Sequence, residues 1–169
     1  MAFFQSSRHV LAGATVIANL SAGNEIVGKA DYRKSLVKAQ SARSICAYIY
    51  ANAGKGESTQ DMVFAGHNLI AENGTLLAES ELFSGQTIYA DIDVERICQE
   101  RRKTSSYGYS VNNNSFNLEY TKVVFDMNTE QNKGGFTRYI DPHPFVPSDK
   151  EKRSQRCLEV ITLQSQGLA

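Results

Sequence analysis

The first half of the chain alternates between short apolar runs and a helical pattern. Residues 12–20 (AGATVIANL) and 45–51 (ICAYIYA) are apolar runs with small, β-branched and aromatic side chains, and each gives way to glycine and polar residues. Such runs are typical of buried strands that lead into loops. Between them, residues 30–45 repeat apolar side chains at helical spacing. The pattern predicts a strand, a helix and a second strand.

The next segment predicts a β-hairpin followed by another strand. Residues 62–72 and 75–80 have strand-like composition, and Asn73-Gly74 stands between them. Asn-Gly favours a two-residue turn because both residues tolerate positive φ. Residues 87–92 (TIYADI) then alternate in polarity as a strand does.

Helical patterns return in the second half of the chain. Residues 94–103 (VERICQERRK) are charged and amphipathic, and Asp93 is placed to cap this helix. Residues 104–137 contain Asn-Asn-Asn and Gly-Gly around one strand candidate, residues 120–125, so we expect the lowest order of the chain there. The element order predicts an α/β fold with a mixed sheet and packed helices.

The C-terminal part predicts a linker and a last helix. All three prolines fall within residues 142–147 (PHPFVP), which favours an extended linker. Ser148 and Glu151 have the spacing of a capping box, so a helix is expected from about Asp149. Its apolar face needs another surface to cover it.

The charge of the chain bears on its partners, and its cysteines bear on its compartment. The chain has 18 basic and 18 acidic residues, so no global field favours nucleic acid or an anionic membrane, although residues 29–43 are locally basic and could receive a small anion. No apolar run approaches the ~20 residues that span a bilayer. Cys46, Cys98 and Cys157 fit neither a disulfide framework nor a metal site, which favours a reducing, cytoplasmic compartment.

Three stretches carry a resemblance to a known family. They are ATVIANLSAGNEIVGKADYR (residues 14–33), AYIYANAGKGESTQDMVFAGHNLIAENGTLLAES (47–80) and DPHPFVPSDKEKR (141–153). The chain resembles the C-terminal half of the nitrilase-like glutaminase domain of glutamine-dependent NAD synthetases, although residues 104–137 match loosely. The resemblance implies part of an α-β-β-α sandwich, divided into residues 1–140 of the glutaminase domain, a linker at 141–148 and, at 149–169, a helix that leads into the synthetase domain.

In that family the nitrilase-like domain hydrolyses L-glutamine, and the ammonia reaches an ATP-dependent synthetase domain that amidates deamido-NAD. The hydrolytic Glu-Lys-Cys triad lies before the NLS motif, so we expect none of the three residues in this sequence and no turnover by the chain alone. ATP, Mg²⁺ and deamido-NAD would bind the synthetase domain, and no cofactor or metal is expected here. The implied partners are that domain, the N-terminal half of the glutaminase domain and further copies in a homo-oligomer.

The cysteines themselves do not predict catalysis. A thioester mechanism needs an accessible thiolate of lowered pKa, a base within reach and oxyanion donors. Cys46 lies inside an apolar run, where a buried structural thiol is the expected state, and Cys98 and Cys157 on amphipathic helices are expected to pack in the core. We therefore assign no catalytic residue.

The resemblance implies that the loop after NLS holds the α-amino and α-carboxylate groups of glutamine, through Gly23 and Lys29, with Ser21 shaping the loop. Both contact positions depart from the family pattern: Gly23 replaces a common Ser and offers only backbone groups, and Lys29 can be Arg in relatives, so a point charge replaces a bidentate fork. The alternatives are a solvated Lys29 and a Ser21 that bonds to local backbone.

Other polar groups receive structural interpretations. His67 is expected to face solvent or to be hydrogen-bonded, since no second metal ligand lies at a suitable spacing, and His143 belongs to the linker. Residues 53–58 (AGKGES) lack the full phosphate-loop pattern, so no ATP binding is expected there.

The alternative to part of an enzyme is a non-catalytic structural or assembly subunit. Such a subunit would pair with a separate nucleophile-bearing half, since half a sandwich exposes apolar surface.

Overall fold

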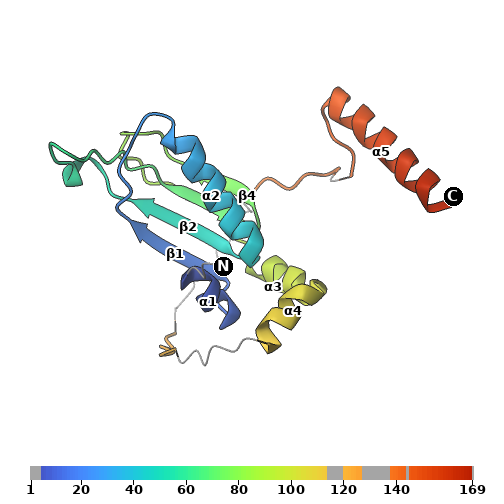
Figure 1. Ribbon diagram of the computed structural model, residues 1–169, viewed down its shortest axis with the longest axis horizontal. Coiled ribbons are helices and arrows are strands. Elements are labelled where there is room, and N and C mark those ends of the chain that lie inside the picture. The colour runs from blue at the N-terminus through green and yellow to red at the C-terminus, as the bar shows by residue number, and fades with distance from the viewer. Residues whose placement is uncertain (1–4, 114–119, 127–137, 144, 169) are drawn as a thin grey trace. The chain divides into compact units, whose positions relative to one another are not determined.

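The computed structural model describes residues 5–113, 120–126, 138–143 and 145–168 (Figure 1). The chain divides into two compact units, residues 1–135 and 136–169. The first unit contains, in chain order, α1 (Gln5–Leu11), β1 (Val16–Ser21), α2 (Lys29–Ser44), β2 (Ala47–Asn52), the 3₁₀ turn η1 (Lys55–Glu57), β3 (Leu69–Glu72), β4 (Thr75–Glu79), α3 (Val94–Lys103) and α4 (Ser105–Asn112); the second contains α5 (Lys150–Leu168).

The predicted strand-helix-strand unit is confirmed as β1-α2-β2. The two strands pair in parallel, with a register that runs from Val16 opposite Ala47 to Ser21 opposite Asn52. Because parallel strands end at the same edge of a sheet, Ser21 and Asn52 lie side by side where the loops begin. The connecting helix α2 lies across one face of the sheet (Figure 1).

The predicted hairpin is also confirmed, although its first strand covers Leu69–Glu72 only and residues 62–68 form no strand. Strands β3 and β4 are antiparallel, and β3 pairs antiparallel with β2, which gives a mixed four-stranded sheet in the order β1-β2-β3-β4. Asn73 (φ 44°) and Gly74 (φ 84°) both have the positive φ of the turn. The Gly74 N–H donates to the Ser41 hydroxyl of α2 (3.2 Å), so the turn is fixed to the helix.

The core lies between the sheet and the helices. It is formed by buried side chains from both layers: Val10, Ile17, Val37, Cys46, Tyr48, Leu69 and Ala71. Full burial of a Val or Leu side chain stabilises a fold by about 1.5–3 kcal/mol, so these contacts fix α2 on the sheet. On the other face of β1 the apolar side chains of Val16 (38%) and Leu20 (87%) are exposed.

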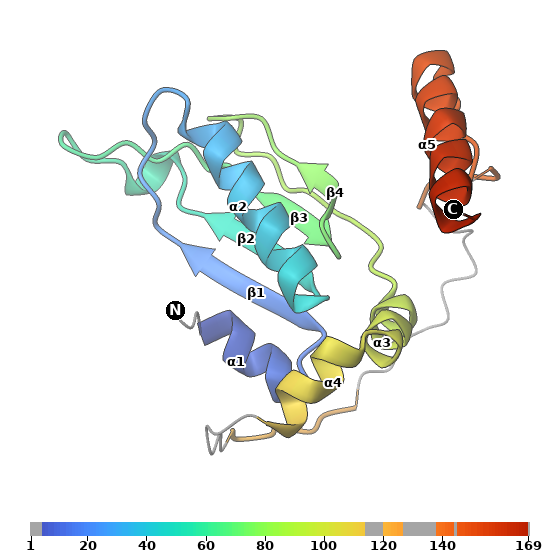
Figure 2. The ribbon, with the colours of Figure 1, turned by 45° about the vertical axis from the view of Figure 1, so that its right-hand side comes forward.

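Helix α3 begins at its predicted cap and is held to the rest of the unit by a buried arginine. The carboxylate of Asp93 accepts the Arg96 N–H (2.8 Å), which confirms the predicted cap. Buried Arg101 donates to the carbonyls of Ile45 (2.9 Å) and Ala14 (2.7 Å), and its guanidinium lies 5.0 Å from the ring centre of Tyr107 in α4. Figure 2 shows α3 and α4 as neighbours.

Some predicted elements are wrong. Residues 87–92 and 120–125 form no strand in the part of the chain that the structure describes, and β4 ends the order of the sheet. Alternation alone cannot make a strand when no partner supplies the hydrogen-bond ladder. Within residues 104–137, α4 occupies the first part, and residues 114–119 and 127–137 lie outside the described residues.

The last helix, α5, has a different cap from the predicted one. The Asp149 carboxylate accepts the Lys152 N–H (2.8 Å), so Asp149 and not Ser148 caps the helix, and the capping-box prediction is wrong. All described residues of α5 are exposed, including apolar Leu158 (66%) and Ile161 (61%). Cys157 is exposed too, so its predicted place in the core is wrong. Among the described residues no helix is long and apolar enough to cross a membrane.

Candidate functional site

The loop after β1 is joined to the end of β2 by the side chain of Asn52. The Gly23 N–H donates to the Asn52 Oδ1 (2.9 Å), and the Asn52 Nδ2 donates to the Gly23 carbonyl (3.1 Å). The Asn52 side chain thus satisfies both polar groups of one loop residue, much as a strand partner would. The loop therefore leaves the sheet edge in a defined conformation.

The same cluster explains why glycine occupies position 23. A Cβ atom there would lie 2.9 Å from the Tyr50 hydroxyl and 3.5 Å from the Asn52 Oδ1. The first distance is shorter than van der Waals contact, so any side chain at position 23 requires Tyr50 to move. Tyr50 in turn donates to the Ser21 hydroxyl (2.9 Å), so Ser21 is in contact with a side chain of the neighbouring strand.

Lys29 is the first residue of α2 and is linked to the same loop. Its Nζ donates to the Asn24 Oδ1 (2.6 Å), and the side chain is half-buried. Gly28, which precedes it, has φ 81° and provides no side-chain cap for the helix. Lys29 is therefore not a fully solvated lysine, and its charge adds to the positive end of the α2 dipole. The structure brings Ser21 and Gly23 into one cluster, to which Lys29 is joined through Asn24.

A second polar cluster lies behind this loop and was not expected from the sequence beyond His67. We call it the Arg33 network: Glu25, Arg33, Lys34, His67 and Glu79. Arg33 donates to the Glu25 carboxylate (2.7 Å) and lies 2.8 Å from the His67 Nδ1. His67 Nε2 lies 2.9 Å from one oxygen of Glu79, and Lys34 lies 2.8 Å from the other. His67 is buried (1% exposed) and hydrogen-bonded. Of its two predicted states, facing solvent or hydrogen-bonded, the second is therefore correct.

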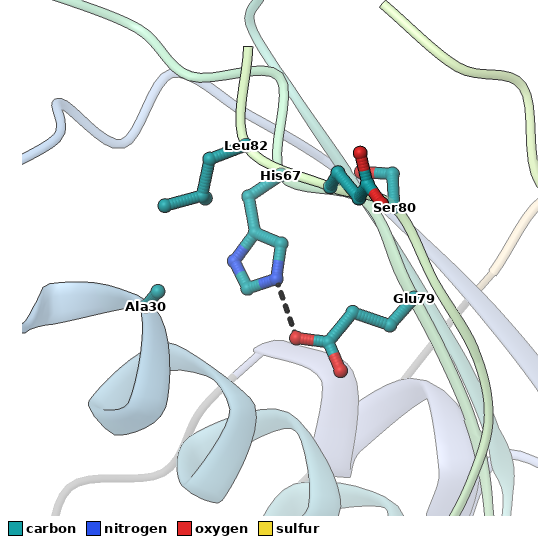
Figure 3. A pocket seen from close by; sticks show the side chains of 6 residues that line it. Ala30, His67, Glu79, Ser80 and Leu82 are labelled. Atoms are coloured by element: carbon teal, nitrogen blue, oxygen red, sulfur yellow. Dashed lines mark hydrogen bonds and ion pairs between the residues drawn. The ribbon is translucent and has the colours of Figure 1, made fainter. Parts of the chain in front are cut away.

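An open depression of about 440 Å³ lies against this network (Figure 3). It is lined by Ala30, His67, Glu79, Ser80, Glu81 and Leu82. Its inner polar atoms already have partners within the chain. The Ser80 hydroxyl, for example, accepts the Asn68 N–H (2.9 Å) and donates to the Gly66 carbonyl (3.0 Å). A polar ligand in this depression would have to displace these bonds.

The exposed end of the network has shifted pKa values. Partial burial acts to raise the pKa of Glu79, but hydrogen bonds from Lys34 and His67 and the charge of Lys34 outweigh it, so the pKa is lowered. The pKa of Lys34 is raised, chiefly by its hydrogen bond to Glu79. Each partner therefore keeps the other charged near neutral pH.

Cys46 is not accessible as a nucleophile. Cys46 is completely buried, and desolvation raises the pKa of its thiol to about 11, against a smaller opposing effect of Arg101. The prediction of a structural thiol is confirmed for Cys46, and Cys98 is half-buried. The part of the chain that the structure describes holds no cluster of His, Cys, Asp and Glu side chains suited to a metal ion.

Comparisons with known proteins agree with this architecture. No protein-family model matches the sequence. The glutamine-dependent NAD(+) synthetase of Mycobacterium bovis is 38% identical over 169 residues, and that of Mycobacterium leprae is 37% identical over 166 residues; each alignment covers 96% of this chain. The chain spans only 24% of the length of these relatives.

Among solved structures, a carbon-nitrogen hydrolase from Helicobacter pylori superposes with a TM-score of 0.51 at 18% identity, covering 62% of this chain and 41% of that one. At this identity the likeness shows the fold alone, and it identifies the mixed sheet with its packed helices as nitrilase-like, as the family resemblance implied. Over nearly its whole length, the chain is homologous to a segment of the glutamine-dependent NAD(+) synthetases, and that is the family in which it belongs.

Proposed function

We propose that the chain supplies the loop that holds L-glutamine in a glutamine-dependent NAD(+) synthetase. In that enzyme, ammonia released from glutamine is used for the ATP-dependent amidation of deamido-NAD. The homology supports the reaction, and the geometry of residues 21–29 supports the role of this segment. The observation that carries the proposal is Lys29 at the positive end of α2, bonded to a loop that Asn52 holds in place.

The loop residues have complementary roles toward an α-amino acid. The ammonium group of Lys29 attracts the α-carboxylate, helped by the N-terminus of α2. The Gly23 carbonyl accepts one hydrogen bond from Asn52, and its second lone pair can accept one from the α-amino group. Ser21 holds Tyr50 in place below the loop. Lys29 contributes a single point charge, so we expect weaker fixation of the carboxylate than by an arginine fork.

Hydrolysis and synthesis require parts of the enzyme outside this segment. We assign the Glu-Lys-Cys triad to the N-terminal half of the glutaminase domain and the sites for ATP, Mg²⁺ and deamido-NAD to the synthetase domain. Residues 141–148 form the linker, and residues 149–169 lead into that second domain. The exposed apolar face of α5 supports this arrangement because such a face needs a partner surface. A cytoplasmic homo-oligomer is part of the same proposal.

The test is the kinetics of Lys29→Ala in the complete synthetase that carries this segment. Loss of a charge-assisted contact to the carboxylate should raise the KM for glutamine at least about tenfold. The rate with ammonium salts should stay within about twofold, because ammonia bypasses the loop. Lys38→Ala, which removes an exposed lysine from the same helix, is the matched control. An unchanged KM for glutamine in Lys29→Ala would refute the assignment.

The second candidate is a structural subunit that pairs with a nucleophile-bearing half and binds no glutamine. The exposure of Val16 and Leu20 on the outer face of β1 favours it, since half a sandwich leaves this surface open. Lys29→Ala separates the two candidates. Leu20→Asp should abolish co-purification with the other half under both of them, whereas Lys29→Ala leaves assembly and activity intact only under the structural candidate.

A further inference from the structure

Arg33 connects the loop after β1 to the hairpin through a buried guanidinium. Only 5% of Arg33 is exposed, and its two hydrogen-bond partners come from different parts of the chain. Glu25 belongs to the loop, and the Glu25 N–H also donates to the Val63 carbonyl (2.7 Å). His67 precedes β3. A single side chain of α2 thus fixes the loop against the segment that enters the hairpin.

The chemistry of these groups determines the protonation of His67. A guanidinium has only donors, so the His67 Nδ1, 2.8 Å from Arg33, must be the acceptor and carry no proton. The neutral ring then carries its proton on Nε2, which donates to Glu79 (2.9 Å). Glu79 is an acceptor because its pKa is lowered. The two hydrogen bonds of His67 therefore have the same direction: Arg33 donates to His67, and His67 donates to Glu79.

The charges around the ring agree with a neutral imidazole. The basic groups that face His67 are Arg33 and, beyond Glu79, Lys34; the acidic groups are Glu79, Glu25 behind Arg33, and Glu81 at the rim of the depression. Within the Arg33 network two positive charges balance two negative ones, and solvent screens the charge of Glu81, which is exposed. A proton on Nδ1 would add a positive charge against the guanidinium and turn the acceptor into a donor.

We propose that Arg33 and His67, with His67 neutral and protonated on Nε2, are positioning residues that hold residues 21–29 in the glutamine-receiving conformation. This inference rests on the proposed function of that loop. His67 does not touch the substrate in this proposal. It acts through Arg33 and Glu25, and the depression beside it is the outer surface of the network, because its inner polar atoms are bonded within the chain.

The proposal is tested first without substrate, by ¹H–¹⁵N NMR of the chain labelled in histidine. The spectrum of His67 at pH 7 should show a pyrrole-type Nε2 and a pyridine-type Nδ1. A proton on Nδ1, alone or together with Nε2, overturns the proposal. Amide hydrogen exchange of residues 22–28 is the second readout. His67→Leu removes both hydrogen bonds and should accelerate exchange there at least about tenfold.

His67→Gln provides the rescue, because its amide has an acceptor for Arg33 and a donor for Glu79. Exchange in the loop should then remain within about threefold of the parent chain, and equal acceleration in the Leu and Gln variants contradicts a role through these two bonds. If His67→Leu does not fold, Glu25→Gln tests the same link at its other end. It keeps an acceptor oxygen but removes the charge, and it should accelerate exchange in residues 22–28 while the His67 ring stays an Nε2–H tautomer.

Kinetics in the complete synthetase separate this inference from the proposed function. His67→Leu should raise the KM for glutamine at least about tenfold without changing the ammonia-dependent rate, and His67→Gln should restore the KM. If the tautomer and exchange results hold but Lys29→Ala leaves the KM unchanged, the proposed function fails and the loop anchor stands. If Lys29→Ala raises the KM but His67→Leu does not, only the positioning role fails.

Discussion

The guanidinium of Arg33 lies 2.8 Å from the Nδ1 of His67, although 34 residues separate them in the sequence. This contact couples the helix that follows the candidate glutamine loop to the start of the hairpin. The geometry assigns the acceptor role to His67, because arginine cannot accept a hydrogen bond.

We expect Arg33→Met to destabilise the fold strongly. The substitution leaves the Glu25 carboxylate and the His67 Nδ1 buried without their donor, and loss of one partner of a buried ion pair costs about 3–5 kcal/mol. Urea unfolding followed by circular dichroism measures the change. The control is Lys38→Ala on the exposed side of α2, which should stay within about 0.5 kcal/mol. Equal stability of the two variants would show that the buried pair contributes nothing.

Glu79 gives a pH dependence with a definite sign. Its pKa is lowered from the ordinary 4.5, so the folded state binds a proton less readily than the unfolded state. The stabilisation is fully present above pH 4.5 and is lost as the pH falls through the lowered pKa. The difference in unfolding free energy between the parent chain and Glu79→Gln should therefore be constant near neutral pH and shrink below pH 4.5. A difference that grows on acidification contradicts the assignment.

The three thiols should react at very different rates with iodoacetamide. With a pKa of about 11, about three in ten thousand Cys46 thiols are ionised at pH 7.5, and the side chain is buried. Exposed Cys157 should be labelled first, half-buried Cys98 more slowly, and Cys46 only in urea. Peptide mass spectrometry resolves the three sites. Labelling of Cys46 as fast as Cys157 in the folded chain would contradict its place in the core.

The sequence was sufficient for the elements with a strong local pattern. The helical period of residues 30–45, the Asn73-Gly74 turn and the Asp93 cap each depend on residues close in sequence, and all three are confirmed. Residues 87–92 show the limit of this reasoning. They alternate as a strand does, but a strand also needs a partner, and that depends on the whole fold.

The sequence indicated one part of the candidate site and missed the other. The resemblance located residues 21–29, but it gave no sign of the Arg33 network. A buried arginine on a helix looks like any surface arginine in the sequence. The apolar period of residues 30–45 also predicted the wrong face of α2 as the buried one, because Tyr32 and Leu36 are exposed and Arg33 and Val37 are buried. The partner His67 is brought close only by the packing of α2 on the hairpin.

The glycine at position 23 leads to the last prediction. The family resemblance implies a serine there, but in this chain a Cβ would lie 2.9 Å from the Tyr50 hydroxyl. Gly23→Ser should therefore displace Tyr50, break its hydrogen bond to Ser21 and destabilise the fold by about 1–3 kcal/mol.

Tyr50→Phe removes the hydroxyl that would clash with a side chain at position 23. The double variant should therefore lose less unfolding free energy than the sum of the two single variants. A double-mutant cycle in urea measures this coupling, which we expect to reach at least about 1 kcal/mol. The control is Gly54→Ser, at a position where a Cβ meets nothing within 4 Å. Combined with Tyr50→Phe it should be additive. Additivity for Gly23→Ser as well would mean that Tyr50 does not determine which residue fits at position 23.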